Sequence, residues 1–194
     1  MLLNLDDLVK EFNLKITGVI HVGMHNMEEL DIYNLCGIKN RVWIEADKGL
    51  CDKFKRTNEK IINAVISDKK ETIDFHIMNK KSSNSILKPF LNIKFRNDIK
   101  LLKTEKRQTK TLKSFNFGKE FNMLNLDIQG AELKALKGCN LENIDYIYTE
   151  VNIKEMYKEI PRIQDLDDYL KDYKRVKTKI HKGRFGDALY IKQK

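Results

Sequence analysis

The sequence predicts an α/β fold with a mostly parallel β-sheet and helices on both of its faces. Short apolar runs alternate with helical patterns through most of the chain, as expected for parallel strands joined by crossover helices. The clearest unit spans residues 122–138, where an apolar run carries Asp127 near its end, Gly130 follows, and a helical pattern stops at Gly138. The end of the chain shows two alternating runs around a glycine turn, which indicates a hairpin.

The first elements alternate between helix and strand. In order, we expect a helix within residues 1–13, a strand over 16–22, a helix over 26–37, a strand over 41–46, a helix from 47, and strands over 60–66 and 73–77. Asn4 and Asn26 are the expected helix caps, the second with Glu29 in a capping box. Gly37 is the expected left-handed helix stop.

The second half repeats the pattern less regularly. We expect a strand over residues 123–128, a helix over 131–138, a strand over 144–151, a helix from Pro161 through residue 173, and a pair of strands over 176–180 and 188–191. Gly183 and Gly186 are expected in the turn of that hairpin. The apolar residues of 82–113 follow neither the helical nor the strand period, and we expect an insertion there on the substrate side of the sheet.

Length and composition indicate one domain over residues 1–194, because the chain is long enough for a full core and no linker divides it. No run approaches the roughly 18 apolar residues of a membrane span. The N-terminus lacks a signal pattern, so we expect a soluble, cytoplasmic protein. Cys36, Cys51 and Cys139 are widely spaced, which predicts reduced thiols and no zinc site.

The net charge of +9 is concentrated in two segments. Residues 95–119 carry eight Lys and Arg against two Asp and Glu, and residues 169–184 carry seven against one. Such segments could bind a polyanion such as RNA. Charge runs are more commonly solvated faces, and lysine is abundant throughout this chain. Nucleic acid therefore stays an alternative partner.

Two predicted strand ends favour a ligand that contains a nucleoside. Gly23 ends the first strand and would let a ligand approach the backbone, although a plain strand-to-helix turn would look the same. Glu45 ends the next strand, 22 residues later, close to the usual spacing of a carboxylate that binds a ribose diol. The other glycines of a dinucleotide fingerprint are missing, which argues against a pyrophosphate.

Four further residues at strand ends could take part in chemistry. His21 and His25 are four residues apart but straddle a strand end, so we expect them to form hydrogen bonds rather than to bind a metal. Asp127 and Glu150 end two later strands, where one could position a substrate amine or hydroxyl and the other act as general base. Either carboxylate could instead cap a helix or pair with a lysine.

The chain resembles the FkbM-type methyltransferases in a series of blocks that run in order along most of its length. These blocks are VIHVGMHNMEE (19–29), WIEA (43–46), NAVIS (63–67), SSNSIL (82–87), LDIQGAELKALKG (126–138), YTEV (148–151) and GDALYI (186–191). The block over 126–138 is the most specific. The resemblance implies a class I, Rossmann-like methyltransferase fold, with a seven-stranded sheet whose last hairpin inserts an antiparallel strand.

The resemblance also implies S-adenosylmethionine as cofactor and a set of residues to bind it. It implies that the Gly23 turn contacts the methionine part, that Glu45 contacts the ribose, and that the loop after the third strand faces the adenine. The expected binding residues are His21, Gly23, His25, Asn26, Glu45, Ala46, Asn63, Ala64, Val65 and Asp127. The sequence departs from the family at Met24 and Met27, where smaller residues are usual, so we expect a bulkier cofactor turn.

Family members often methylate hydroxyl groups of sugars or small molecules, and the resemblance implies the same reaction here. We expect Asp127 to orient the acceptor or to act as base, with Glu150 as the second candidate. An RNA methyltransferase that uses the two basic segments is one alternative. Such enzymes tend to have a Lys-Asp-Lys-Glu tetrad, and its two lysines cannot both be placed in this sequence. A non-catalytic module that binds nucleosides or polyanions is the other.

Overall fold

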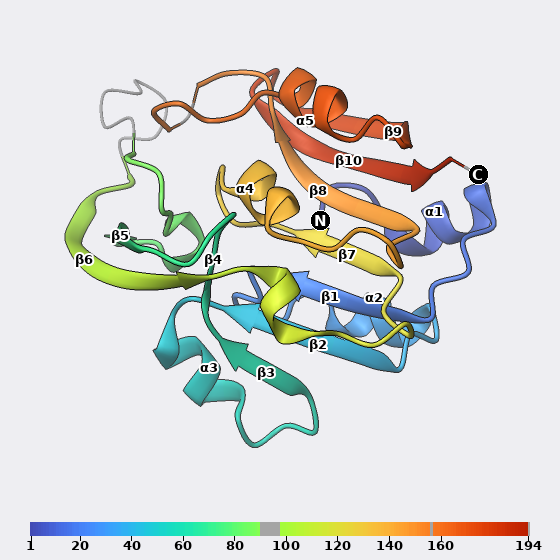
Figure 1. Cartoon of the computed structure of the whole chain (residues 1–194), viewed down its shortest axis with the longest axis horizontal. Coiled ribbons are helices and arrows are strands. Elements are labelled where there is room, and N and C mark those ends of the chain that lie inside the picture. Colours follow the sequence, from blue (N-terminus) through green and yellow to red (C-terminus); the bar gives the residue numbers. More distant parts are fainter. Residues whose placement is uncertain (90–97, 156, 194) are drawn as a thin grey trace.

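Seven strands form the central sheet of the computed structural model, which describes residues 1–89, 98–155 and 157–193. They are β1 (Gly18–Val22), β2 (Asn40–Glu45), β3 (Lys60–Asn63), β7 (Met123–Leu126), β8 (Tyr146–Asn152), β9 (Tyr173–His181) and β10 (Phe185–Lys192). Their order across the sheet is β3-β2-β1-β7-β8-β10-β9 (Figure 1). The pairs from β3 to β8 are parallel, whereas β10 runs antiparallel to both β8 and β9. The predicted mostly parallel sheet with an antiparallel C-terminal hairpin is confirmed.

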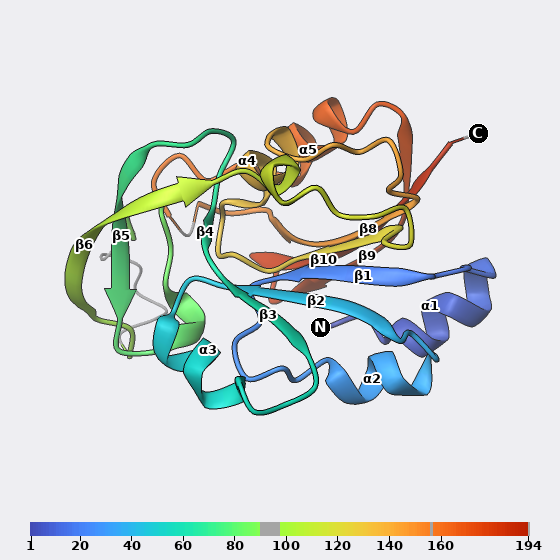
Figure 2. The ribbon, with the colours of Figure 1, turned by 60° about the horizontal axis from the view of Figure 1, so that its bottom comes forward.

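Helices cover both faces of this sheet (Figure 2). They are α1 (Leu5–Phe12), α2 (Leu30–Leu35), α3 (Lys48–Phe54), α4 (Glu132–Lys137) and α5 (Ile163–Tyr169). Alternate residues of β1 point to opposite faces, so Val19 packs in one core with Leu8 of α1, and Ile20 packs in a second core with Leu136 of α4. The two-layered core follows directly from this alternation.

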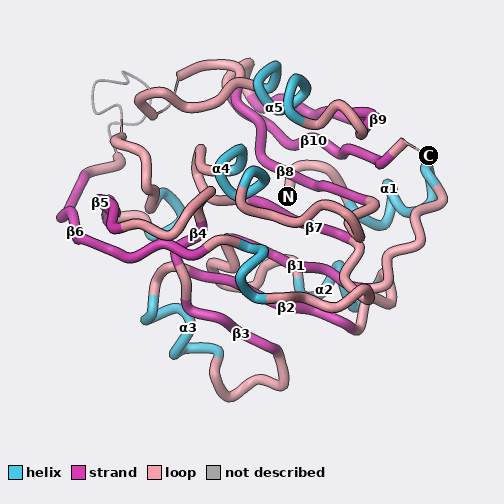
Figure 3. The backbone as a smooth tube through the Cα atoms, in the orientation of Figure 1, coloured by secondary structure: helices cyan, strands magenta, loops and turns pink. Residues whose placement is uncertain are grey.

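A smaller, three-stranded sheet lies beside the carboxyl ends of β1 and β2 (Figure 3). It contains β4 (Val65–Ile66), β5 (Thr72–Met78) and β6 (Leu101–Lys110), and two short 3-10 helices follow β5 and β6, namely η1 (Lys81–Ser83) and η2 (Leu112–Phe115). The strand predicted over residues 60–66 is therefore wrong as a single element, because β3 joins the large sheet and β4 joins the small one. The unassigned stretch 82–113 contains β6, and residues 90–97 lie outside the described part of the chain.

The predicted helix cap at Asn26 is wrong. Helix α2 begins at Leu30, with Glu29 at its N-cap and no capping side chain. His25 and Met27 both take a left-handed backbone conformation, with φ of 45° and 59°. These two residues turn the chain once more before the helix starts, which a capping pattern in the sequence does not reveal.

Two predictions near the C-terminus also differ from the structure. Helix α5 ends at Tyr169, and Tyr173 begins β9, where its hydroxyl donates to the carbonyl oxygen of Ile144 at 2.7 Å. Gly183 lies in the hairpin turn with φ of 63°, as expected. Gly186 instead belongs to β10, where an added Cβ would lie 2.0 Å from the carbonyl oxygen of Lys179. This glycine permits close contact between the two strands.

Candidate functional site

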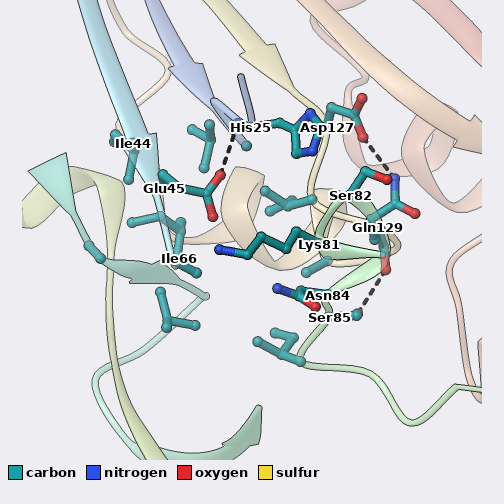
Figure 4. Close-up of a pocket in the computed structure, with 18 of the residues that line it drawn as sticks. His25, Ile44, Glu45, Ile66, Lys81, Ser82, Asn84, Ser85, Asp127 and Gln129 are labelled. Carbon is teal, nitrogen blue, oxygen red and sulfur yellow. Dashed lines mark hydrogen bonds between the residues drawn. The ribbon is translucent and has the colours of Figure 1, made fainter. Parts of the chain in front are cut away.

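A cavity of about 260 Å³ lies at the carboxyl ends of β1, β2 and β7 (Figure 4). Ligands of open α/β sheets bind at this edge. Gly23 and Glu45 line it from the ends of β1 and β2, and Asp127 lines it from the end of β7. Phe75 of β5 and Lys81 of η1 also line it, so the small sheet and η1 form the rest of the cavity wall.

Gly23 brings the first of these strand ends into contact with the last. Its φ is +96°, and an added Cβ would lie 1.9 Å from the backbone oxygen of Asp127. Its N–H donates to the carbonyl oxygen of Ile44 at 2.9 Å, and the N–H of Asp127 donates to that of Val22 at 3.0 Å. Only glycine lets the loop after β1 pass this close to β7.

Glu45 is held by backbone donors and still has room for a ligand. One carboxylate oxygen accepts the N–H of His25 at 3.0 Å, and the other accepts the N–H of Asp47 at 2.8 Å. Burial raises the pKa of Glu45, while these two hydrogen bonds lower it. Each oxygen has a second lone pair, so the carboxylate can also accept hydrogen bonds from hydroxyl groups.

Asp127 and Glu150 are joined through the side chain of Gln129. The amide nitrogen of Gln129 donates to Asp127 Oδ1 at 2.9 Å and to Glu150 Oε2 at 3.0 Å. The side chain of Asp127 is exposed to the cavity, and desolvation by the surrounding protein raises its pKa. Burial and the neighbouring charge of Asp127 raise the pKa of Glu150 well above its usual value. A raised pKa makes a carboxylate a stronger base, so the pair is suited to accept a proton.

A second cavity, of about 190 Å³, lies on the far side of this pair. It shares Ser82, Asp127 and Gln129 with the first cavity, whereas Glu150 lines the second and not the first. Tyr157 and Phe185 add two aromatic rings to its wall. The two carboxylates and the Gln129 amide therefore stand where the two cavities meet.

The structure brings together most of the predicted cofactor residues. Those that line the first cavity are Gly23, His25, Glu45, Ala46, Ala64, Val65 and Asp127. His21 is buried against Trp43, with ring centroids 4.8 Å apart, and burial lowers its pKa to about 4. Asn26 is exposed and accepts a hydrogen bond from Lys53, and Asn63 donates to the backbone of Glu45. These last three residues do not line the cavity. The binding role of every residue in the set stays a prediction.

The bulky turn residues do not enter the cavity. Met24 and Met27 are buried in the core beside α1 and α2, on the other side of the turn. Sequence reasoning missed Gln129, Phe75 and Lys81 as lining residues. Gln129 could have been suspected from its place between Asp127 and Gly130, whereas nothing in the sequence places Lys81 beside Asp47, its partner at 3.1 Å.

The two basic segments lie on different sheets. The first includes β6, where Lys103 and Arg107 both pair with Glu105, and its residues 95–97 lie outside the described chain. The second includes β9, the edge strand of the large sheet, where Arg175 pairs with Asp167.

Within residues 1–89, 98–155 and 157–193, no group of three His, Cys, Asp or Glu side chains is placed to hold a metal ion. No helix among the same residues is long and apolar enough to cross a membrane.

The sequence matches the family model of the methyltransferase FkbM domain over residues 21–176. Two solved structures are similar, each with a TM-score of 0.51. One is an S-adenosylmethionine-dependent methyltransferase from Clostridium acetobutylicum, 11% identical, with 98% of this chain and 89% of that chain covered. The other is from an E. cuniculi complex responsible for methylation of a translation termination factor, 9% identical, with 97% and 92% covered. At such identities the likeness concerns the fold alone. A search of curated proteins found no significant match.

Proposed function

Because this chain belongs to the FkbM methyltransferase family, we propose that it methylates a hydroxyl group of a sugar, a glycan or another small molecule. The cofactor is S-adenosylmethionine, which supplies a methyl group on a positively charged sulfur. The proposal rests on one observation above all: the ends of β1, β2 and β7 place Gly23, Glu45 and Asp127 around one cavity.

The chemistry of the first cavity fits this cofactor. Glu45 offers free lone pairs to the two ribose hydroxyls, and its own backbone hydrogen bonds hold it in place. Ala64 and Val65, with Phe75 facing them, provide an apolar wall for the adenine. The glycine turn at Gly23 leaves backbone accessible to the methionine part.

The second cavity is the proposed acceptor site. Asp127 would orient the acceptor hydroxyl or remove its proton, with Glu150 as the second carboxylate of the pair. None of the described residues that line this cavity is a lysine or arginine, so nothing there would offset a phosphate charge. The rings of Tyr157 and Phe185 offer flat apolar surfaces of the kind that suit one face of a sugar ring. This lining favours an uncharged hydroxyl acceptor over RNA.

Calorimetric titration with S-adenosylmethionine tests the cofactor site. We expect the unchanged protein to bind it and Glu45→Ala to lose at least about tenfold in affinity, because a charge-assisted hydrogen bond contributes roughly 1.5–3 kcal/mol. Glu142→Ala removes an exposed carboxylate that lines neither cavity and serves as the control. Equal affinity in Glu45→Ala and the control would reject the ribose role of Glu45.

A further inference from the structure

The side chain of Gln129 connects the two cavities. Gln129 lies in the turn between β7 and α4 and lines both of them. Its amide nitrogen donates to Asp127 at 2.9 Å and to Glu150 at 3.0 Å. Figure 4 shows the first of these two bonds. An amide nitrogen carries two hydrogens, so it can donate one to each carboxylate at the same time.

The orientation of this amide is fixed from its other side. The Tyr157 hydroxyl has one hydrogen to share between the carbonyl oxygen of Ser83 at 3.2 Å and Gln129 Oε1 at 3.3 Å. The hydroxyl of Ser85 donates to the Gln129 backbone oxygen at 2.8 Å. With a donor on the amide oxygen and two carboxylates on the nitrogen, a flipped amide would face the carboxylates with its own oxygen. That arrangement would be repulsive, so the two carboxylates favour the observed orientation of the amide.

The backbone of Gln129 is itself unusual. Its φ is +54°, in the left-handed region, directly before Gly130 at φ +98°. A side chain in this region costs roughly 1 kcal/mol or more relative to glycine. A turn that needed only its shape would favour glycine at this position. The costly residue is therefore consistent with a role for the side chain.

Acidic groups surround the carboxylate pair on several elements. Glu132 of α4, Asp187 of β10 and Glu29 before α2 all act on Asp127 or Glu150 through their charge, and the amino group of Met1 opposes them at Asp127. Lys81 of η1 is engaged with Asp47. Such surroundings favour protonation of both carboxylates, whereas N–H donors favour the ionised forms.

We propose that Gln129 is a positioning residue that holds Asp127 and Glu150 together as one proton-accepting pair between the two cavities. Its use in catalysis rests on the proposed function. The proton released by the acceptor hydroxyl, when its oxygen gains the methyl group, passes to a carboxylate oxygen of the pair and then to water. Gln129 touches neither the acceptor hydroxyl nor the methyl group, and it acts through the two carboxylates.

Titration of the two carboxyl groups tests this role without any acceptor. We would follow the side-chain carboxyl ¹³C resonances of Asp127 and Glu150 against pH in ¹³C-labelled protein, assigned with Asp127→Asn and Glu150→Gln. In Gln129→Met the midpoints of both groups should rise by roughly one pH unit, because each loses a hydrogen bond to its charged form. Gln129→Glu keeps the shape and adds a third carboxyl group, so its shift should be larger.

Gln164→Met is the matched control, since Gln164 is exposed on α5 and its amide donates to Asp168. In this variant the titration midpoints of Asp127 and Glu150 should equal those of the unchanged protein. Unchanged midpoints in Gln129→Met would overturn the proposal, and if that variant does not fold, Gln129→Leu, which also lacks the amide, takes its place. The titration uses cofactor-free protein. A failure to bind S-adenosylmethionine would therefore refute the proposed function and leave this test intact.

Discussion

Replacing Gly23 by alanine should disrupt the site through the backbone. The new Cβ would lie 1.9 Å from the backbone oxygen of Asp127, where real Cβ contacts essentially never fall below 3.0 Å. Either the loop after β1 or the end of β7 must therefore move by more than an ångström. Because Gly23 and Asp127 line the same cavity, this movement also displaces the groups that we assign to cofactor binding.

The expected loss of stability has two parts. Alanine at φ +96° costs roughly 1–2 kcal/mol. The overlap with Asp127 adds about 1–3 kcal/mol, as for other insertions into well-packed regions. Together they predict a loss of about 2–5 kcal/mol, a large part of the roughly 5–15 kcal/mol that stabilises a typical domain.

Gly37 provides the control for this experiment. Its φ is +71°, but an added Cβ would meet no atom within 4 Å, so Gly37→Ala should lose only the roughly 1–2 kcal/mol of backbone strain. Urea unfolding of both variants measures the difference, and titration with S-adenosylmethionine should show lost affinity in Gly23→Ala alone. The reasoning is wrong if Gly23→Ala is no less stable than Gly37→Ala.

Two further substitutions probe the acidic groups. Asp127→Asn should keep cofactor binding but lose methyl transfer, measured with labelled cofactor and a panel of methyl glycosides and short RNAs; normal turnover would remove Asp127 from the mechanism. Burial raises the pKa of Glu132 to about 7, against 4.5 for a free carboxyl, so this group stabilises the fold below pH 4.5 and the contribution is lost as the pH rises through 7. The loss is on the order of 3 kcal/mol. Urea unfolding at pH 5 and pH 8 should show that the free energy of unfolding changes less with pH in Glu132→Gln than in the unchanged protein. An equal slope in both proteins would contradict that assignment.

Local patterns in the sequence were enough to find the strand ends that form the site. Gly23, Glu45 and Asp127 each follow an apolar run, and parallel strands necessarily bring their carboxyl ends to one edge. The antiparallel hairpin could be predicted because alternation marks its two strands on either side of Gly183. These features depend on neighbours in sequence.

The features that could not be predicted depend on distant contacts. Strand β6 carries mostly charged and polar side chains, so its apolar residues show no regular alternation, and its pairing with β5 defines it instead. The left-handed turn at His25 and Met27 contains no glycine to announce it. The bond from Gln129 to Glu150 joins residues 21 apart, and only the fold places them together.

We propose that the cavity between Gly23, Glu45 and Asp127 binds the cofactor. A crystal structure with bound S-adenosylhomocysteine tests it most directly. We expect the ribose hydroxyls within hydrogen-bond distance of the Glu45 carboxylate and the sulfur on the side of the cavity formed by Asp127 and Gln129. A cofactor bound elsewhere, or one whose ribose does not reach Glu45, would contradict the claim.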